Sequence, residues 1–210
     1  MGYDNAKRVM DLAAGVPLFL VTLPVQAVAA LAILVTMGRP ILFTQTRPGL
    51  HGKPFAMRKF RTMHPEDPAK GWTDDASRLT PVGRFLRSTS IDELPTIWNI
   101  VDGNLSLVGP RPLLMRYLDR YSPDQARRME VKPGLTGLAQ VSGRNAQKWE
   151  ERLAYDVEYV DNRSLALDLK ILWRTVQVVL RRDGVSADDH ATMPEFLGTP
   201  SPTETQEFDR

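Results

Sequence analysis

Residues 12–38 read LAAGVPLFLVTLPVQAVAALAILVTMG, and this apolar stretch decides the fold. It contains no charged residue, and Asp11 lies just outside it. Because about 20 apolar residues cross a bilayer, the stretch is long enough to enter or span a membrane. A secretory signal peptide is a poorer interpretation, because its apolar region is typically about 7–15 residues long and ends at a small-residue cleavage site.

Length alone favours a simple spanning helix, but Pro24 and the flanking charges favour another topology. Pro24 lies near the middle of the stretch, where it removes a backbone donor and kinks or breaks a helix. Lys7 and Arg8 precede the stretch and Arg39 follows it, so both flanks carry the charge that prefers the cytoplasmic side. We therefore expect residues 1–38 to form a re-entrant helix–break–helix hairpin that enters and leaves the membrane by one face.

Beyond Gly38 the sequence has the mixed character of a folded domain. Strands are expected at 41–46 and 55–63, and a loop rich in Pro, Asp and Gly follows at 64–80. We expect a small, helix-rich α/β domain with short strands over 39–193, followed by a disordered polar tail over 194–210. The helical patterns of this domain lie at 82–86, 91–101, 113–121, 149–160 and 165–180.

The helix expected at 165–180 carries an apolar stripe that admits two interpretations. Most such stripes pack into the core of a domain. The basic and aromatic residues around this stripe would equally suit a helix at the level of the lipid headgroups, so both interpretations stay open. The stripe consists of Leu165, Leu169, Leu172, Val176 and Val179, with Lys170, Trp173, Arg174, Arg181 and Arg182 around it.

Composition excludes several classes of function. The chain has 210 residues and no cysteine, which removes thiol nucleophiles, disulfides and cysteine zinc sites. Its three histidines, His51, His64 and His190, are scattered, so a histidine metal site is not expected. The 27 Lys and Arg against 25 Asp and Glu leave a net charge of only +2. The arginines also do not alternate with stacking aromatics, so nucleic acid is not an expected partner.

The most informative charged residues lie in RFLRSTSIDELP, residues 84–95. Ser90 and Glu93 match an S-x-x-E capping box, so a plain helix start is the simplest interpretation. However, Arg87 and an arginine one turn earlier stand just upstream, and such cations would keep Asp92 and Glu93 ionised. An ionised carboxylate can attack phosphorus, and its neighbour can hold Mg²⁺ together with substrate phosphate oxygens. The pattern is compatible with phosphoryl transfer.

Arg111 stands between Pro110 and Pro112 in the stretch SLVGPRP. The second proline favours an extended backbone at Arg111, so its guanidinium is displayed on a stiff segment. Such a donor suits a phosphate or a carboxylate, and an ordinary structural salt bridge is an equally good interpretation.

Taken in order along the chain, these residues resemble those of the bacterial sugar transferases, specifically the small monotopic phosphoglycosyl transferases. The resemblance runs from about residue 7 to 190. The minimal members that it matches include the transferase that starts bacterial N-linked protein glycosylation, which the pattern G-V-S-x-x-x-H-A-T at 184–192 also resembles. The shared motifs are K-R-x-x-D at 7–11, F-T-Q-x-R-P-G at 43–49, K-F-R-T-M at 59–63, R-S-T-S-I-D-E-L-P at 87–95, S-L-V-G-P-R-P-L at 106–113, K-P-G-L-T-G-L-A-Q-V-S-G-R-N at 132–145 and L-D-L-K-I-L at 167–172.

The resemblance implies a re-entrant hairpin bent at Pro24 and a catalytic Asp–Glu dyad at Asp92 and Glu93. Asp92 would attack the β-phosphorus of a UDP-sugar and expel UMP. The phosphosugar-aspartyl intermediate would then pass to a polyprenyl phosphate such as undecaprenyl phosphate. Glu93, with Asp92, would bind Mg²⁺.

The resemblance also implies the remaining site residues and the location. Arg87 and Arg111 would hold the donor phosphates, with Lys59 and Arg144 lining the site. Residues 39–193 would form the catalytic domain on the cytoplasmic face of the bacterial inner membrane, at the first membrane step of glycoconjugate biosynthesis. The subgroup favours an N-acetylated amino sugar.

The residue before the hairpin proline departs from the family pattern. Members of this kind often carry Ser there, and this chain has Leu23. Thr22 is one position earlier and points about 100° away around a helix, which leaves the details of the bend open. The alternative to an enzyme is a non-catalytic, membrane-anchored basic scaffold, which predicts membrane association without magnesium-dependent turnover.

Overall fold

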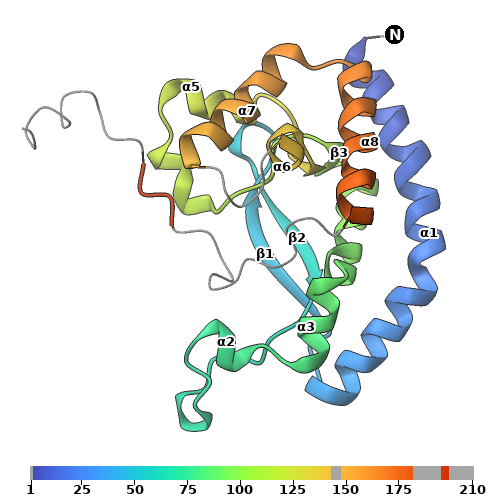
Figure 1. Ribbon diagram of the computed structural model, residues 1–210, viewed down its shortest axis with the longest axis vertical. Coiled ribbons are helices and arrows are strands. Elements are labelled where there is room, and N and C mark those ends of the chain that lie inside the picture. Colours follow the sequence, from blue (N-terminus) through green and yellow to red (C-terminus); the bar gives the residue numbers. More distant parts are fainter. Residues whose placement is uncertain (1, 143–147, 182–194, 199–210) are drawn as a thin grey trace, which may run out of the picture.

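The computed structural model describes residues 2–142, 148–181 and 195–198, which form one helix-rich domain with a long helix along one side (Figure 1). The α-helices are α1 (Tyr3–Met37), α2 (Asp75–Arg78), α3 (Pro81–Ser88), α4 (Ile97–Val101), α5 (Pro123–Ala126), α6 (Leu138–Ser142), α7 (Trp149–Asn162) and α8 (Leu165–Arg181). The 3₁₀ helices are η1 (Leu50–Gly52), η2 (Pro68–Lys70), η3 (Ile91–Thr96), η4 (Met115–Arg120) and η5 (Arg127–Met129). Arg144 and the 184–192 pattern lie outside the described residues.

The strands are few and short, which confirms a helix-rich domain with short strands. β1 (Leu42–Pro48) and β2 (Pro54–Phe60) form an antiparallel hairpin with Leu42 opposite Phe60. β3 (Ser106–Val108) and β4 (Gly134–Thr136) pair in parallel. The hairpin buries alternate side chains of β2, Phe55 and Met57, as the period of two requires. These side chains join Leu105, Val108, Tyr159 and Ile171 in the main hydrophobic core.

Helix α1 runs without interruption through Pro17 and Pro24, so the predicted break at Pro24 is wrong. The hydroxyl of Thr22 donates to the carbonyls of Leu18 (2.7 Å) and Phe19 (3.1 Å) and accepts from the amide of Gln26 (3.1 Å). Such back-bonding and an internal proline bend a helix without ending it. In Figure 1, α1 is accordingly bowed around the domain rather than divided into two helices.

Polar residues near the start of α1 attach it to the domain. Lys7 Nζ donates to Asp168 Oδ2 at 2.8 Å, and the Asp168 side chain is 0% exposed. Arg8 Nη1 donates to the carbonyl of Ile100 at 2.6 Å, where α4 ends. Asp11 Oδ1 accepts from a hydroxyl and a main-chain N–H of β3, each at 3.0 Å. The K-R-x-x-D motif therefore docks α1 onto α4, α8 and β3.

The other end of α1 rests on the same domain. Ala29 and Ile33 are buried against Phe60 and Leu86. Arg61 Nη2 donates to the carbonyl of the last residue of α1 at 2.7 Å and to that of the following glycine at 2.6 Å. Both ends of the apolar helix are thus held by one domain, whereas a helix that projects away from its domain would be held at one end.

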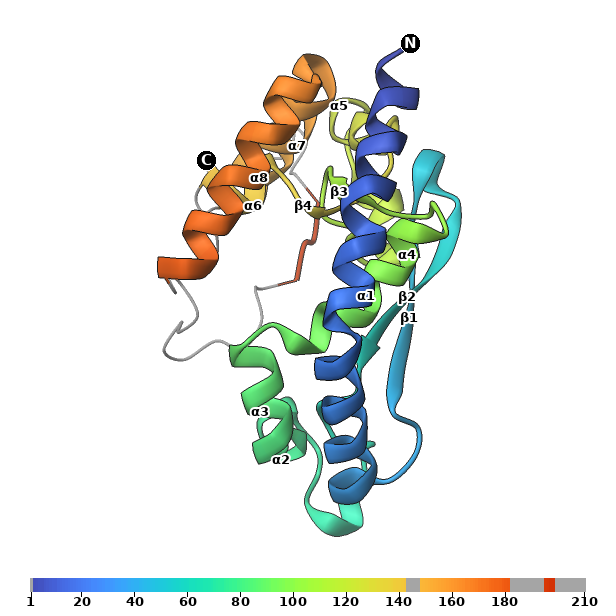
Figure 2. The ribbon, with the colours of Figure 1, turned by 90° about the vertical axis from the view of Figure 1, so that its right-hand side faces the viewer.

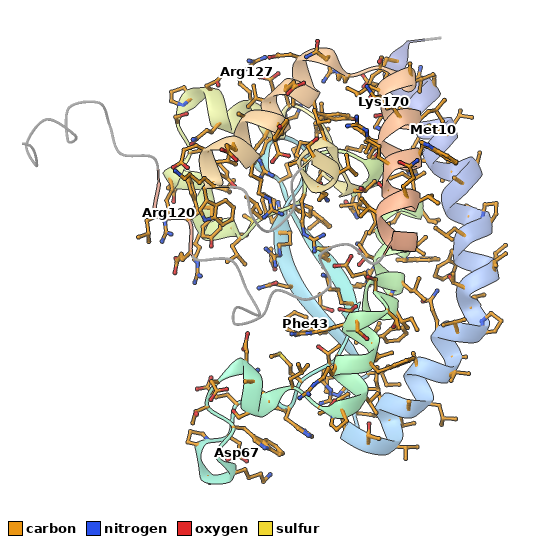
Figure 3. The ribbon with its side chains drawn as sticks, in the orientation of Figure 1. Met10, Phe43, Asp67, Arg120, Arg127 and Lys170 are labelled. Carbon is orange, nitrogen blue, oxygen red and sulfur yellow. The ribbon has the colours of Figure 1, made fainter. Side chains whose placement is uncertain are left out.

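The outer side of α1 and one face of α8 are apolar and exposed. Helix α1 is long and apolar enough to cross a membrane, and Val21 and Val35 are each 76% exposed. On α8, Leu169, Trp173 and most of the predicted stripe are exposed, so packing of that stripe into the core is wrong. The helix buries Ile171 and Asp168 instead, because these positions face the core and Lys7. Figure 2 shows α1 and α8 side by side. Figure 3 shows side chains that project outward along α1.

Residues 195–198, which we expected to belong to a disordered tail, pack against the domain. Phe196 is 1% exposed and contacts Tyr117, Tyr121 and Trp149, with ring centroids 5.4–5.7 Å apart. Glu195 pairs with two arginines of η4. An aromatic pocket that buries a whole phenyl ring overrides the polar composition of the surrounding tail.

The buried Lys7–Asp168 pair should contribute strongly to stability. Asp168 also accepts from Tyr3 (3.0 Å) and Tyr159 (2.7 Å). We predict that Lys7→Met lowers the free energy of unfolding by about 3–5 kcal/mol, because it leaves a buried carboxylate without its cation. Arg58→Met, which removes the exposed Arg58–Asp102 pair, should cost less than about 1 kcal/mol. Denaturant unfolding in detergent measures both, and equal losses would contradict the prediction.

Candidate active site

Asp92 and Glu93 lie on η3, which is fastened to the edge of β2. Thr96 Oγ1 donates to the carbonyl of Arg58 at 2.8 Å, and Asn99 Nδ2 donates to that of Ala56 at 2.9 Å. The predicted capping box is wrong, because the Ser90 side chain caps nothing. Ser90 instead has the left-handed backbone φ of 56°, which turns the chain sharply from α3 into η3. The Glu93 side chain is therefore free to reach the neighbouring segments.

Glu93 joins three segments that are distant in sequence. Its Oε1 accepts from Lys59 Nζ of β2 at 2.6 Å and from Arg111 Nη2 at 2.9 Å. Burial by itself would raise the pKa of Glu93, but the charges and hydrogen bonds of Arg111 and Lys59 outweigh it and lower the pKa to about 2. Glu93 is thus a fixed negative charge between two cations, as the sequence interpretation expected for an ionised carboxylate.

Asp92 experiences the opposite balance. Burial is the largest influence on it, and the negative charge of Glu93 adds to it, so the pKa of Asp92 is raised. Lys59 and Arg87 oppose this rise without cancelling it. The nearby cations therefore do not lower the pKa of Asp92 as they lower that of Glu93, because desolvation outweighs those cations. Adjacent carboxylates with diverging pKa values are typical of sites that use them in different roles.

Arg87 is positioned by a close approach of α3 to the chain that follows β2. Its Nε donates to Thr62 Oγ1 at 3.0 Å, and its Nη2 lies 3.1 Å from Met63 Sδ. A Cβ at Gly83 would lie 1.9 Å from the carbonyl oxygen of Thr62, so α3 reaches this distance only with glycine there. This packing places the positive charge of Arg87 where it opposes, without cancelling, the rise in the pKa of Asp92.

Arg111 lies in an irregular segment, as its two flanking prolines predicted, and its pKa is raised chiefly by Glu93. The Arg111 guanidinium forms a salt bridge with Glu93. This contact is compatible with a purely structural salt bridge and also with a phosphate-binding role beside the two carboxylates. Arg47 and Arg152 lie close to it, and burial followed by the charge of Arg111 lowers the pKa of each. The sequence interpretation missed these two arginines, although Arg47 is part of the F-T-Q-x-R-P-G motif.

The structure brings together five of the predicted site residues. Carboxylates and cations from β2, α3, η3 and the segment after β3 meet at one place, and Lys59 and Arg111 are distant in sequence from the other three. No group of three or more His, Asp or Glu that could hold a metal by protein ligands alone occurs within 2–142, 148–181 and 195–198. The five residues are Lys59, Arg87, Asp92, Glu93 and Arg111.

A family model for bacterial sugar transferases matches residues 2–182. The chain belongs to this family. The transferase is 50% identical over 194 residues to the uncharacterized sugar transferase EpsL of Bacillus subtilis. The match covers 92% of this chain and 96% of EpsL. It is 44% identical to the UDP-glucose:undecaprenyl-phosphate glucose-1-phosphate transferase of Caulobacter vibrioides, over 86% of this chain and 72% of the relative.

A third relative, the undecaprenyl-phosphate galactose phosphotransferase of Salmonella typhimurium, is 40% identical over 85% of the transferase. The match covers 41% of that longer protein. The named relatives therefore include transferases of glucose 1-phosphate and a galactose phosphotransferase, all of which use undecaprenyl phosphate.

The depressed pKa of Glu93 predicts how the stability of the transferase depends on pH. Because the folded pKa is about 2 and the ordinary value 4.5, the contribution is present above about pH 4.5 and is lost as pH falls towards 2. We predict that Glu93→Gln destabilises the fold on the order of 2 kcal/mol at pH 6, and by clearly less at pH 3.

Denaturant unfolding at the two pH values measures this difference. Glu130→Gln is the matched control, since it removes an exposed contact with Arg127 and should cost less than about 1 kcal/mol at pH 6. A Glu93→Gln effect that is equal at both pH values would contradict the assignment of the depressed pKa to this carboxylate.

Proposed function

We propose that the transferase moves a sugar 1-phosphate from a UDP-sugar to undecaprenyl phosphate, with release of UMP, through a covalent phosphosugar-aspartate. The observation that carries the proposal is the environment of Asp92. Its neighbour Glu93 is bound by Lys59 and Arg111, and the positive charge of Arg87 acts on Asp92 itself. Such a site can hold several negative phosphate oxygens while one carboxylate stays available as a nucleophile.

The two steps balance without a proton donor. Asp92 forms a bond to the β-phosphorus of the UDP-sugar as the bond from that phosphorus to the oxygen of UMP breaks. An oxygen of undecaprenyl phosphate then attacks the same phosphorus, which releases the aspartate and gives a diphosphate-linked sugar. Arg87 and Arg111, with Lys59 and Arg144, stabilise the phosphoryl charge in both steps. The raised pKa of Asp92 makes its ionised form more basic, which favours attack.

Mg²⁺ fits this site as a partner of the substrate. Asp92 makes no ion pair with any residue in the described part of the chain, and Glu93 stands beside it. Mg²⁺ typically binds one or two carboxylates and completes its shell with water and phosphate oxygens, so these two oxygen donors suit it. When bound, Mg²⁺ would neutralise charge on the diphosphate of the donor.

The sugar is a separate part of the proposal. The subgroup resemblance favours an N-acetylated amino sugar for this chain and a role in glycoconjugate biosynthesis, including protein glycosylation. The named relatives act on glucose or galactose. A test of the donor therefore has to include UDP-glucose and UDP-galactose together with UDP-linked acetamido sugars.

The exposed apolar surfaces support a monotopic location on the inner membrane. Both ends of α1 are held by the catalytic domain, while the outer side of the helix is apolar. Helix α8 lies on the same side of the molecule as α1 (Figure 2), and Leu169 and Trp173 on it are exposed. A bowed helix with both ends on one face would enter and leave the bilayer by that face, with the domain in the cytoplasm and α8 at the headgroup level.

The covalent step predicts a mass change. Purified protein with magnesium and a panel of UDP-sugars, without lipid acceptor, should gain the mass of one phosphosugar, and UMP should be released. Asp92→Asn should give no adduct, because an amide cannot act as this nucleophile. Asp102→Asn, at an exposed ion pair, is the matched control and should give the wild-type adduct.

Intact-protein mass spectrometry also identifies the sugar. An Asp92→Asn variant that forms the adduct would contradict the role of Asp92. A folded wild type that yields neither an adduct nor UMP, with or without undecaprenyl phosphate, would favour the scaffold interpretation.

The membrane placement predicts that residues before and after the apolar stretch 12–38 label from one face. The chain has no cysteine, so single cysteines at Asn5 and Thr44, both exposed, report cleanly. In sealed vesicles, a membrane-impermeant thiol reagent should label both positions from the cytoplasmic side. Labelling from opposite sides would show that α1 spans the bilayer.

A further inference from the structure

Arg128 is a buried arginine whose guanidinium has a partner for each nitrogen. It lies on η5 and is 3% exposed. Its Nε and Nη2 donate to Asp156 Oδ2 of α7 at 3.0 and 2.7 Å, and Asp156 is also 3% exposed. Its Nη1 donates to Tyr121 Oη at 3.2 Å, and its Cζ lies 5.5 Å from the centre of that ring.

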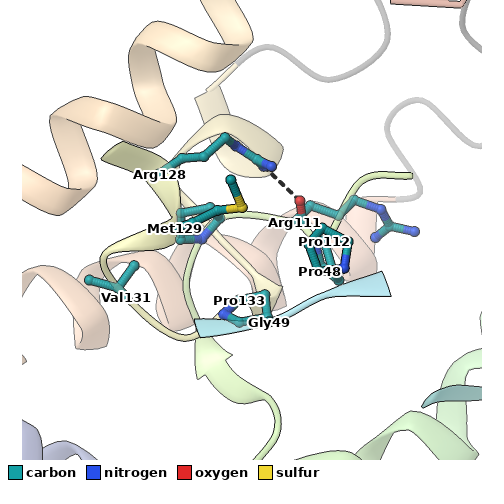
Figure 4. A pocket seen from close by; sticks show the side chains of 9 residues that line it. Pro48, Gly49, Arg111, Pro112, Arg128, Met129, Val131 and Pro133 are labelled. Carbon is teal, nitrogen blue, oxygen red and sulfur yellow. Dashed lines mark hydrogen bonds between the residues drawn. The ribbon is translucent and has the colours of Figure 1, made fainter. Parts of the chain in front are cut away.

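One N–H of Arg128 is directed at the backbone of Arg111. Arg128 Nη2 also donates to the carbonyl oxygen of Arg111 at 2.7 Å, and Figure 4 shows the two residues facing each other across a small hollow. Pro48, Pro112 and Pro133 line the same hollow. The backbone of Arg111 is therefore stiffened by proline and fixed by a charged hydrogen bond, so mainly its side-chain torsions remain free.

Stability alone is a weak explanation for this arrangement. A buried ion pair is often no more stabilising than apolar residues of similar volume. The geometry of Arg128 serves another purpose, because a planar guanidinium can bind Asp156, Tyr121 and a carbonyl at once, which a lysine ammonium cannot do with the same directions. The carbonyl that it binds belongs to the residue whose own guanidinium reaches Glu93 at 2.9 Å.

We infer that Arg128 is the positioning residue for Arg111, and that it fixes where the Arg111 guanidinium meets the donor diphosphate. The connection runs from Asp156 on α7, through Arg128, to the backbone of Arg111 and on to the carboxylate pair. It rests on the proposed function, because it assigns Arg111 to the phosphates of that reaction. Loss of Arg128 displaces Arg111, and displacements near 1 Å can reduce turnover about 100-fold.

A double-mutant cycle tests whether Arg128 acts through Arg111. We expect Arg128→Lys to lower kcat/KM for UMP release from the UDP-sugar about 10–100-fold, with magnesium and undecaprenyl phosphate present. In an Arg111→Met background the same change should have an effect of less than about threefold, because the residue that it positions is gone. A loss of equal size in both backgrounds would show a general structural role and overturn the inference.

Two further variants separate positioning from folding. Arg127→Lys is the matched control. Arg127 is the neighbour of Arg128 on η5 and pairs with Asp161 at the surface, and it is labelled in Figure 3. This substitution should change kcat/KM less than about twofold. If Arg128→Lys fails to fold, Tyr121→Phe removes only the hydroxyl that accepts from Arg128 Nη1. It should give a smaller loss that again disappears in the Arg111→Met background, and persistence of that loss would overturn the inference.

Binding of UDP gives the same cycle a readout that does not need turnover. We expect Arg128→Lys to weaken the Kd for UDP in the wild-type background and to leave it unchanged beside Arg111→Met. A wild type that binds UDP but releases no UMP would refute the proposed reaction, and the binding cycle would still decide the role of Arg128. A wild type that neither binds UDP nor turns over would overturn both proposals.

Discussion

The carboxylate of Asp168 holds the whole arrangement together. It is fully buried at the start of α8 and receives hydrogen bonds from Lys7 and Tyr3 of α1 and from Tyr159 of α7. A charge in such a position is tolerated only when cations and donors surround it, so the three helices must meet there. Tyr159 Oη also lies 3.3 Å from the carbonyl oxygen of Val108 on β3. The apolar helix α1, the core and the strand that leads to Arg111 all contact this one group.

The active site uses the same principle with a different outcome. Glu93 lies between two cations and has a pKa of about 2, whereas Asp92, the residue before it, has a raised pKa because burial and the charge of Glu93 dominate its environment. Two neighbouring carboxylates can therefore differ in role: Glu93 is a fixed charge that binds Lys59 and Arg111, and Asp92 would be the reactive group of the proposed reaction. The difference depends on which side chains reach each carboxylate rather than on any difference in their position along the chain.

Secondary structure was largely predictable, and the exceptions have local causes. The strands near 41–46 and 55–63 and the helix from Trp149 were found because their apolar periods are clear. The helix expected over 91–101 is a 3₁₀ segment followed by α4, with Pro95 inside the first part. The break expected at Pro24 does not occur, because a proline disturbs only one turn and the rest of a long helix keeps its hydrogen bonds. Phe196 was missed because its aromatic pocket is assembled from η4 and α7.

The sequence by itself determined the apolar helix, the adjacency of Asp92 and Glu93, the stiff proline setting of Arg111 and membership of the family through an ordered set of motifs. These properties are local, because each depends on residues within a few positions of one another. Only the tertiary structure decided in which direction the pKa of each carboxylate shifts and which surfaces stay exposed. Lys59 and Arg111 lie 34 and 18 residues from Glu93, and the exposure of the α8 stripe depends on α1 and the core. Both pKa values and burial are set by what the fold brings into contact, which no local pattern records.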